Sequence, residues 1–511
     1  MKKIIAILIL AAAFASCTKL DIAPNSQLTD QTSFKSKSEF LNGLAGVYTS
    51  IGVWGGQNVY YFGGGSTDEM LFPARGTDWK GDNQLIFLHT VTPATNEVNN
   101  FYNSLSNIIA VTNTYIAVID ASSLKDDSDV KVMRSEARFL RAFAYFNMVD
   151  YFGNVPLVTK ATYDASNPPK QATRADLYNF VKTELTDLAS SALPATNSYG
   201  RVDKYAAEAL LAKLYLNSAI YLGTANANLA DVVTLTSDIV SNSSYSLDPS
   251  YHHVFGATNG VNNVETLFTM ICKNKGTACV NMSAMFSLDD SRDTYGAWAS
   301  GWDGAATLPT FYRSFESTDI RRAQFIAGPQ FFPDGVTPSI QTDDQGRTRQ
   351  LVYAVDFTAK DPVNNADHWD GARGGKYMMD GYGNFGNMGS GGMMNSDMPI
   401  LRFADVLMMK AEAEYRQNPG STDALALVNQ VRLRGGNPVA PLTSLNDANF
   451  LAERGREFAW EGWRRNDLIR FGKYGVAWDY KPADGTDRTI LPIPATQIQS
   501  NPNLRQNPGY N

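Results

Sequence analysis

The stretch from Pro399 to Tyr474 constrains the fold more than any other part of the chain. Within it, Phe403, Leu407 and Ala411 recur every four residues and therefore lie on one face of a helix. An Asn-Pro-Gly sequence ends that helix, and a second apolar stripe of helical period follows directly. Two helices separated by so short a turn pack against each other as a helical hairpin.

A third helix is predicted to begin near Asn446. Its apolar seam would consist of Leu451, Gly455, Phe458 and Gly462. The same segment carries Glu457 and Glu461 among several arginines. Paired carboxylates can act on a glycosidic bond, but arginine neighbours at helical spacing favour an ion-pair network instead.

Three segments of the chain align with one another, at 136–146, 208–218 and 405–415. Each has a basic residue at the same position and small alanines where a partner helix would pack. Repeated helical hairpins of this kind resemble tetratricopeptide repeats, which stack because one pair cannot bury its apolar face alone. The alternative is a set of amphipathic helices that are similar by coincidence. The sequence predicts a mainly α-helical fold with a tetratricopeptide-like scaffold.

The third copy follows the second at a much greater distance than the second follows the first. The excess is a large, irregular, loop-rich insertion with a few short strands, rich in Gly-Asp-Asn turns. We expect ligand contacts in such loops, because a rigid scaffold holds them in place. The predicted organisation is a signal peptide at 1–17, a helical scaffold at 18–244 with a glycine- and aromatic-rich loop at 52–95, the insertion at 245–398, and a C-terminal helical region at 399–511.

The first seventeen residues have the pattern of an export signal. Lys2 and Lys3 precede a short apolar run, which is the length of a signal peptide core and is too short to span a bilayer. Small residues then stand directly before Cys17, as in a lipobox. We expect Cys17 to carry a lipid that anchors the mature chain to a membrane. The alternative is ordinary cleavage with Cys17 incidental.

Charge and cysteine usage exclude some functions. The formal net charge is −7 and no long basic run occurs, so no nucleic-acid partner is expected. Cys272 and Cys279 could close a small loop as a disulfide outside the inner membrane, and two free thiols are the alternative. No HExxH or GxSxG motif is present, and we expect no catalytic residue, no catalytic metal and no enzyme activity. A structural calcium ion at Asp289, Asp290 and Asp293 stays possible, although a solvated turn is the default for such a run.

Three C-terminal motifs carry a family resemblance. RFADVLMMKAEAEY, ERGREFAWEGWRRNDLIRFG and LPIPATQIQSNPNLRQNPGY closely resemble the C-terminal signature of the SusD/RagB family and occur in that family's order. The resemblance implies a nutrient-binding lipoprotein of the bacterial outer membrane, facing the cell exterior. It also implies a SusC-like TonB-dependent barrel as partner, with this chain closing over the mouth of the barrel.

Two aromatic clusters in glycine-rich loops are the candidate ligand site. Flat aromatic rings beside Asp and Arg suit sugars, which present C–H patches and a rim of hydroxyls. The stretch TDEMLFPARGTDW resembles a glycan-site segment of the family, and this likeness implies Asp68, Arg75 and Trp79 as ligand contacts. The second cluster consists of Tyr295, Trp298 and Trp302, and Trp369 is a further, weaker candidate. For any one of these residues, packing of a loop onto the scaffold is the alternative role.

The sequence therefore predicts a surface lipoprotein that captures an oligo- or polysaccharide and delivers it to the barrel. The first alternative is oligopeptide capture, as the RagB side of the family implies. A lipid-anchored glycoside hydrolase and a protein-binding scaffold are the others.

Overall fold

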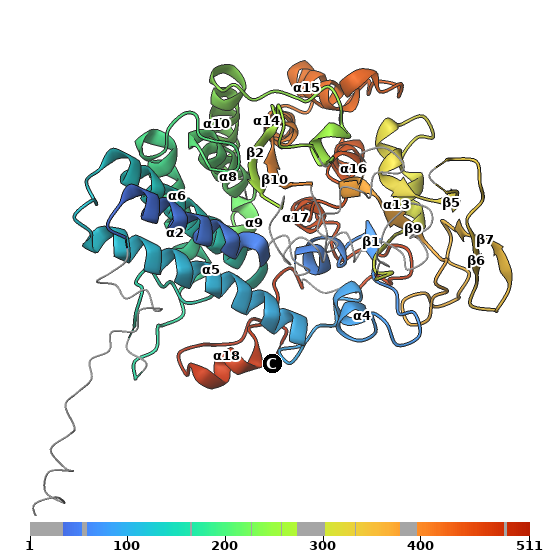
Figure 1. Ribbon diagram of the computed structural model, residues 1–511, viewed down its shortest axis with the longest axis horizontal. Helices are drawn as coiled ribbons and strands as arrows, with labels where there is room; N and C mark the ends of the chain where they lie inside the picture. The colour runs from blue at the N-terminus through green and yellow to red at the C-terminus, as the bar shows by residue number, and fades with distance from the viewer. Residues whose placement is uncertain are drawn as a thin grey trace, which may run out of the picture.

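The computed structural model describes residues 34–53, 59–163, 166–225, 227–256, 258–272, 302–332, 334–378, 396–484 and 488–510. Long helices gather on one side of the molecule, and short strands with irregular loops form the other side (Figure 1). The prediction of a mainly α-helical, tetratricopeptide-like scaffold with a loop-rich insertion is confirmed. Among the described residues, no helix combines the length and the apolar character that a membrane span requires.

Antiparallel helices build the N-terminal part of the scaffold. The first begins at a capping box, in which the Ser36 hydroxyl accepts from the Glu39 backbone N–H and the Glu39 carboxylate accepts from the Ser36 N–H. The long pair α5 and α6 follows, and α7 packs on α6. The helices of this part are α2 (Lys37–Ser50), α4 (Asp82–Phe87), α5 (Asn96–Ala121), α6 (Ser128–Asn147), α7 (Arg174–Asp187), α8 (Lys204–Leu216), α9 (Ser218–Leu222) and α10 (Leu229–Asn242).

The three aligned segments fall on α6, α8 and α14, and the last of these meets α8 and α10 although it is distant in sequence. Lys213 of α8 joins it there, because its ammonium lies 2.5 Å from the Asp405 carboxylate. As predicted, Phe403, Leu407 and Ala411 are buried on one face of α14. The C-terminal helices are α14 (Phe403–Gln417), α15 (Thr422–Arg432), α16 (Asp447–Glu457), α17 (Arg464–Arg470) and α18 (Ala495–Ser500).

The third predicted helix is shorter than expected. Asn446 caps α16 as predicted, but the helix ends at Glu457, so the seam does not continue to Gly462. The backbone of Gly462 has a φ of +79°, which a right-handed helix does not allow. A Cβ at that position would lie 2.4 Å from the Val59 side chain, so the glycine serves a close approach in a turn.

Short strands connect the insertion to the scaffold. β10 runs antiparallel to β2, with Met398 opposite Met270 and Arg402 opposite Thr266, and leads directly into α14. A small four-stranded sheet has the order β1-β3-β9-β4, while β5 pairs with β8 and β6 with β7. The strands are β1 (Met70–Leu71), β2 (Thr266–Met270), β3 (Ala306–Thr307), β4 (Phe325–Ile326), β5 (Gly328–Pro329), β6 (Ile340–Thr342), β7 (Thr348–Gln350), β8 (Val352–Tyr353), β9 (Ala372–Gly374) and β10 (Met398–Arg402); the short helix α13 (Pro309–Arg313) lies beside them.

A buried ion-pair network lies where these strands meet α16. Arg402 contacts the carboxylates of Glu265, Glu457 and Glu461, and Lys376 lies 2.6 Å from Glu461. Burial alone would raise the pKa of Glu457, but Arg434, Arg402 and Arg321 hold it below its usual range. The preference for an ion-pair network over a catalytic pair at Glu457 and Glu461 is confirmed.

Candidate functional site

Trp79 and Trp302 meet at the surface on the insertion side of the molecule. The indole N–H of Trp79 donates to the Trp302 carbonyl oxygen at 2.6 Å. Trp302 is 42% exposed, while Trp79 is half-buried against Phe72, with ring centroids 5.5 Å apart. This hydrogen bond ties the Trp79 side chain to the backbone of Trp302, so that two aromatic residues from distant parts of the sequence lie next to each other with neither fully buried.

The buried side chain of Arg75 holds the loop that carries Trp302 in place. Its guanidinium is buried and donates to the carbonyl oxygens of Asp303 at 2.6 Å, Gly304 at 2.9 Å and Asp370 at 3.0 Å. Burial, reinforced by the neighbouring Arg373, lowers the pKa of Arg75 to about 9. The side chain therefore ties the loop after Trp302 to the 367–370 turn. No part of the guanidinium points to solvent where a ligand could lie.

A polar rim continues from the two indoles. The Nδ1 atom of His368 lies 2.9 Å from an Asp344 carboxylate oxygen, and its Nε2 atom lies 4.0 Å from Asp303, in the loop that carries Trp302. Gln345 donates to the Asp367 carboxylate at 2.9 Å. Apart from the buried Asp303, these side chains are at least partly exposed, and they combine donors with acceptors. Such a mixture next to flat rings is the usual composition of a saccharide site.

The structure places Trp369 in a small core of its own. The residue is 4% exposed and packs with Leu351 and Tyr353. The guanidinium of Arg349 lies over its ring, 4.4 Å from the centroid. In this position the indole stabilises the fold of the insertion, and its ring is covered.

Asp68 lies apart from the two indoles. Its carboxylate accepts two hydrogen bonds from Arg464, each 2.7 Å long, on the wall of a separate pocket of about 510 Å³. Trp478 and Asp479 line the same pocket, whereas Trp79 and Trp302 do not. Asp68 precedes strand β1 and Trp79 follows it, so the intervening strand and turn carry the two side chains to different places.

Several predicted residues lie outside the described part of the chain. Among them are Tyr295, Trp298, Cys17, Cys279 and the aspartates at 289, 290 and 293. Cys272 is disulfide-bonded, which agrees with the predicted disulfide and not with the alternative of free thiols. Within the residues that the structure does describe, no group of three or more His, Cys, Asp or Glu side chains could hold a metal ion.

Four residues of these pockets and rims were not predicted from sequence motifs: Trp478, Asp479, His368 and Asp344. Trp478 and Asp479 stand in GVAWDYKPADG, a turn rich in glycine and aromatic residues like the loops that were singled out. The same compositional signal could have found them. His368 and Asp344 carry no such signal, because only the fold brings the two turns together.

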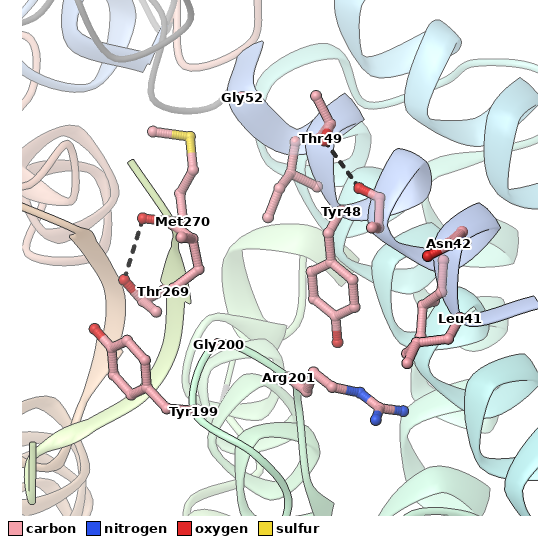
Figure 2. Close-up of a pocket in the computed structure, with 14 residues that line it drawn as sticks. Leu41, Asn42, Tyr48, Thr49, Gly52, Tyr199, Gly200, Arg201, Thr269 and Met270 are labelled. Atoms are coloured by element: carbon pink, nitrogen blue, oxygen red, sulfur yellow. Dashed lines mark hydrogen bonds between the residues drawn. The ribbon is translucent and has the colours of Figure 1, made fainter. Parts of the chain in front are cut away.

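A second pocket, of about 280 Å³, is mostly apolar and lies between α2 and the end of β2 (Figure 2). Tyr48 points from α2 toward Arg201, with Tyr199, Thr269 and Met270 on the other side. The Tyr48 hydroxyl donates to Glu136 at 2.7 Å, and Arg201 forms an ion pair with the same carboxylate. Because these polar groups already have partners, the pocket suits an apolar side chain better than a sugar.

Comparison with known proteins agrees with this fold. A family model described as "SusD family" matches residues 240–487, and one described as "Starch-binding associating with outer membrane" matches residues 20–216. The starch-binding protein SusD of Bacteroides thetaiotaomicron is 26% identical, covering 99% of this chain and 97% of its own length. SusD-like protein P2 of Formosa agariphila is 25% identical, with both chains fully covered.

Solved structures share the architecture. Surface glycan-binding protein A from Bacteroides uniformis superposes with a TM-score of 0.72 at 20% identity, covering 92% of this chain and 99% of its own. A laminarin-binding SusD-like protein superposes with a TM-score of 0.71 at 23% identity, covering 93% and 100%. At these identities the likeness establishes the fold. With two family models that together span most of its length, the chain belongs to the SusD/RagB family.

Proposed function

We propose that this chain is a cell-surface glycan-binding lipoprotein of the outer membrane, which captures an oligo- or polysaccharide and delivers it to a SusC-like TonB-dependent barrel. The observation that carries the proposal is the pairing of half-buried Trp79 with exposed Trp302, in which the Trp79 indole donates to the Trp302 backbone carbonyl beside a polar rim. Relatives named for starch, laminarin and surface glycan binding support the ligand class.

The proposed site differs in detail from the set predicted from sequence. Trp79 and Trp302 form the ligand surface, and the rim of His368 and Asp344 supplies hydrogen bonds. Arg75 positions the loop that carries Trp302 and does not contact the ligand itself. Tyr295 and Trp298, which precede Trp302 closely in sequence, stay candidate contacts.

Native affinity electrophoresis tests this function. The chain without residues 1–17 is run in gels that contain starch, laminarin or other polysaccharides, beside Trp302→Ala and Trp79→Ala. Tyr163→Ala is the matched control, because Tyr163 is 62% exposed on the loop between α6 and α7. We expect one polysaccharide to slow the wild type and the control, and to slow the tryptophan variants much less, because packing of the sugar's C–H face on an indole is lost.

Each other result has a definite meaning. Retardation that Trp302→Ala does not change would keep the function and reject this site. If no gel slows the wild type, glycan capture falls behind oligopeptide capture. Release of shorter sugars during incubation would instead favour a glycoside hydrolase, against the non-catalytic role that we propose.

The anchor and the partner belong to the same proposal. A lipid on Cys17 would be joined to Phe34, where the described chain begins, through the sixteen residues 18–33, a link that spans at most on the order of 55–60 Å. Phe34 packs on α2, whose exposed Leu41 borders the apolar pocket of Figure 2. The barrel, embedded in the same membrane, is therefore proposed to contact this face with an apolar side chain.

Co-purification tests the contact. Leu41→Asp would place a charge at the pocket mouth, and we expect it to reduce recovery of a tagged barrel from detergent extracts. Val336→Asp is the control, because Val336 is 77% exposed in the insertion, between β5 and β6. Equal recovery with both variants would place the contact elsewhere, and the gel experiment would still judge glycan binding separately.

A further inference from the structure

The pocket beside Asp68 has the architecture of a ligand site and is not used by the proposed function. It lies between α13, α16, α17 and the 477–479 turn, with a volume of about 510 Å³. Small-molecule sites commonly measure about 300–1,000 Å³. The side chains that matter for its chemistry are Asp68, Thr310, Phe311, Arg464, Trp478 and Asp479.

The polar side chains of this pocket offer more unused hydrogen-bond acceptors than donors. Arg464 donates its Nε and Nη2 hydrogens to Asp68 and its Nη1 hydrogen to the Leu451 carbonyl oxygen at 2.9 Å. Thr310 donates its backbone N–H at 2.6 Å and its hydroxyl at 2.7 Å to the two oxygens of Asp479. Each carboxylate offers about four lone-pair positions, so both retain acceptor capacity.

A ligand for such a pocket must be small and must carry several hydrogen-bond donors. Asp68 is 27% exposed at its side chain and is fixed in orientation by two short hydrogen bonds, which is how a carboxylate is prepared for recognition. A sugar ring supplies several hydroxyl donors, and its C–H faces suit the aromatic walls at Phe311 and Trp478. The guanidinium of Arg464 lies 5.7 Å from the Phe311 ring centroid, which fixes these groups relative to each other.

An ammonium ligand is the other chemistry that acceptors and aromatic rings attract. Here a cation is already in place, because the Lys481 ammonium lies 4.3 Å from the Trp478 ring centroid. Arg464 adds a second positive charge on the wall. Both cations are paired with carboxylates, Arg464 with Asp68 and Lys481 with Asp484 at 3.3 Å. Because the Lys481 ammonium already interacts with the Trp478 ring, a second ammonium would compete for that ring, whereas a neutral polyhydroxylated ring would not.

We propose that this pocket is a second saccharide site, separate from the indole pair and able to hold one or two sugar residues. Its ligand class rests on the proposed function, while its geometry does not. Asp68 and Asp479 accept from ring hydroxyls, and Trp478 packs on a C–H face. A chain that uses both places holds a polysaccharide at two points, which increases overall affinity through effective concentration.

Fluorine NMR separates the two sites in one experiment. The eight tryptophans are replaced by 5-fluorotryptophan, and the Trp478 and Trp302 resonances are assigned from Trp478→Phe and Trp302→Phe. The probes are glucose, galactose, mannose, xylose and fucose, each titrated to tens of millimolar, a range suited to weak binding of one ring. We expect at least one sugar to shift the Trp478 resonance in a saturable way.

The variants decide the role of the acids. Asp479→Asn should weaken the response at Trp478 at least tenfold, because a charged acceptor is lost. Asp187→Asn, a half-exposed acid on α7, is the control and should leave it unchanged. Unchanged resonances of the other tryptophans would show that Asp479→Asn is folded.

No shift at Trp478 with any of the five sugars would overturn the proposal, and so would an equal response in Asp479→Asn. A stronger response to butylamine than to every sugar would reject the saccharide class. A shift at Trp302 alone would keep the proposed function and reject the second site. A shift at Trp478 without one at Trp302, together with no retardation in the gels, would keep the second site and reject the proposed function at the indole pair.

Discussion

Replacing Arg402 with methionine should cost more stability than any exposed charge change in this protein. The guanidinium is about 1% exposed and donates to Glu461 at 2.7 and 2.8 Å and to Glu265 at 2.6 Å, with Glu457 at 3.2 Å. Methionine has a similar unbranched shape, so it removes the charge with little change in packing. The three buried carboxylates would then keep only their other cations.

The magnitude follows from the burial. Removing one partner from a buried ion pair typically costs about 3–5 kcal/mol, because the remaining charge is left without compensation. The entropy of unfolding is about 2.1 cal/mol/K per residue, hence about 1 kcal/mol/K for a chain of about 500 residues. The melting temperature of Arg402→Met should therefore fall by about 3–5 °C.

Differential scanning calorimetry of the chain without residues 1–17 measures this shift. Arg134→Met is the matched control, because Arg134 donates to Asp120 through a similar two-point contact that is half-exposed. Exposed pairs contribute about 0.2–1 kcal/mol, so the control should melt within about 1 °C of the wild type. If Arg402→Met also melts within that interval, the buried network contributes no more to the stability of the fold than an exposed ion pair does.

Three further predictions use the same measurement. Burial raises the pKa of Glu69 to about 8, so the folded carboxyl keeps a proton that the unfolded chain releases near 4.5. The free energy of unfolding should therefore fall as pH rises between these two values. Glu69→Gln should flatten that decline, and an unchanged pH profile would contradict this reasoning. Burial lowers the pKa of His89 to about 4, so stability should fall as pH drops from 6.5 toward 4, and His89→Gln should reduce this loss if the histidine is its source. A Cβ on Gly63 would lie 2.3 Å from the Gly462 carbonyl oxygen, so Gly63→Ala should lower the melting temperature. Gly46 in α2 has open space around it, so Gly46→Ala should raise the free energy of unfolding by about 0.5–1 kcal/mol. Equal effects of the two substitutions would refute the close approach at Gly63.

The local elements could be predicted because their signals are local. The four-residue spacing of Phe403, Leu407 and Ala411 and the capping box at Ser36 depend on neighbours within one or two helical turns. The helical boundary at Glu457 was missed because a glycine is compatible with both a helix seam and a turn. The left-handed backbones of Trp460 and Gly462 distinguish the two, and Gly462 lies where its backbone approaches Val59 closely.

The sequence by itself determined the class of this protein and the residue types of its candidate site. Helical period, aromatic loops and the C-terminal motifs are all properties of short stretches. The tertiary structure alone decided which of those residues share a place. Arg75 faces inward because backbone carbonyls from two distant loops converge on it, and Asp68 joins Trp478 rather than Trp79 because strand β1 separates them. Such contacts join segments hundreds of residues apart, where no periodicity or spacing in the sequence carries information about distance.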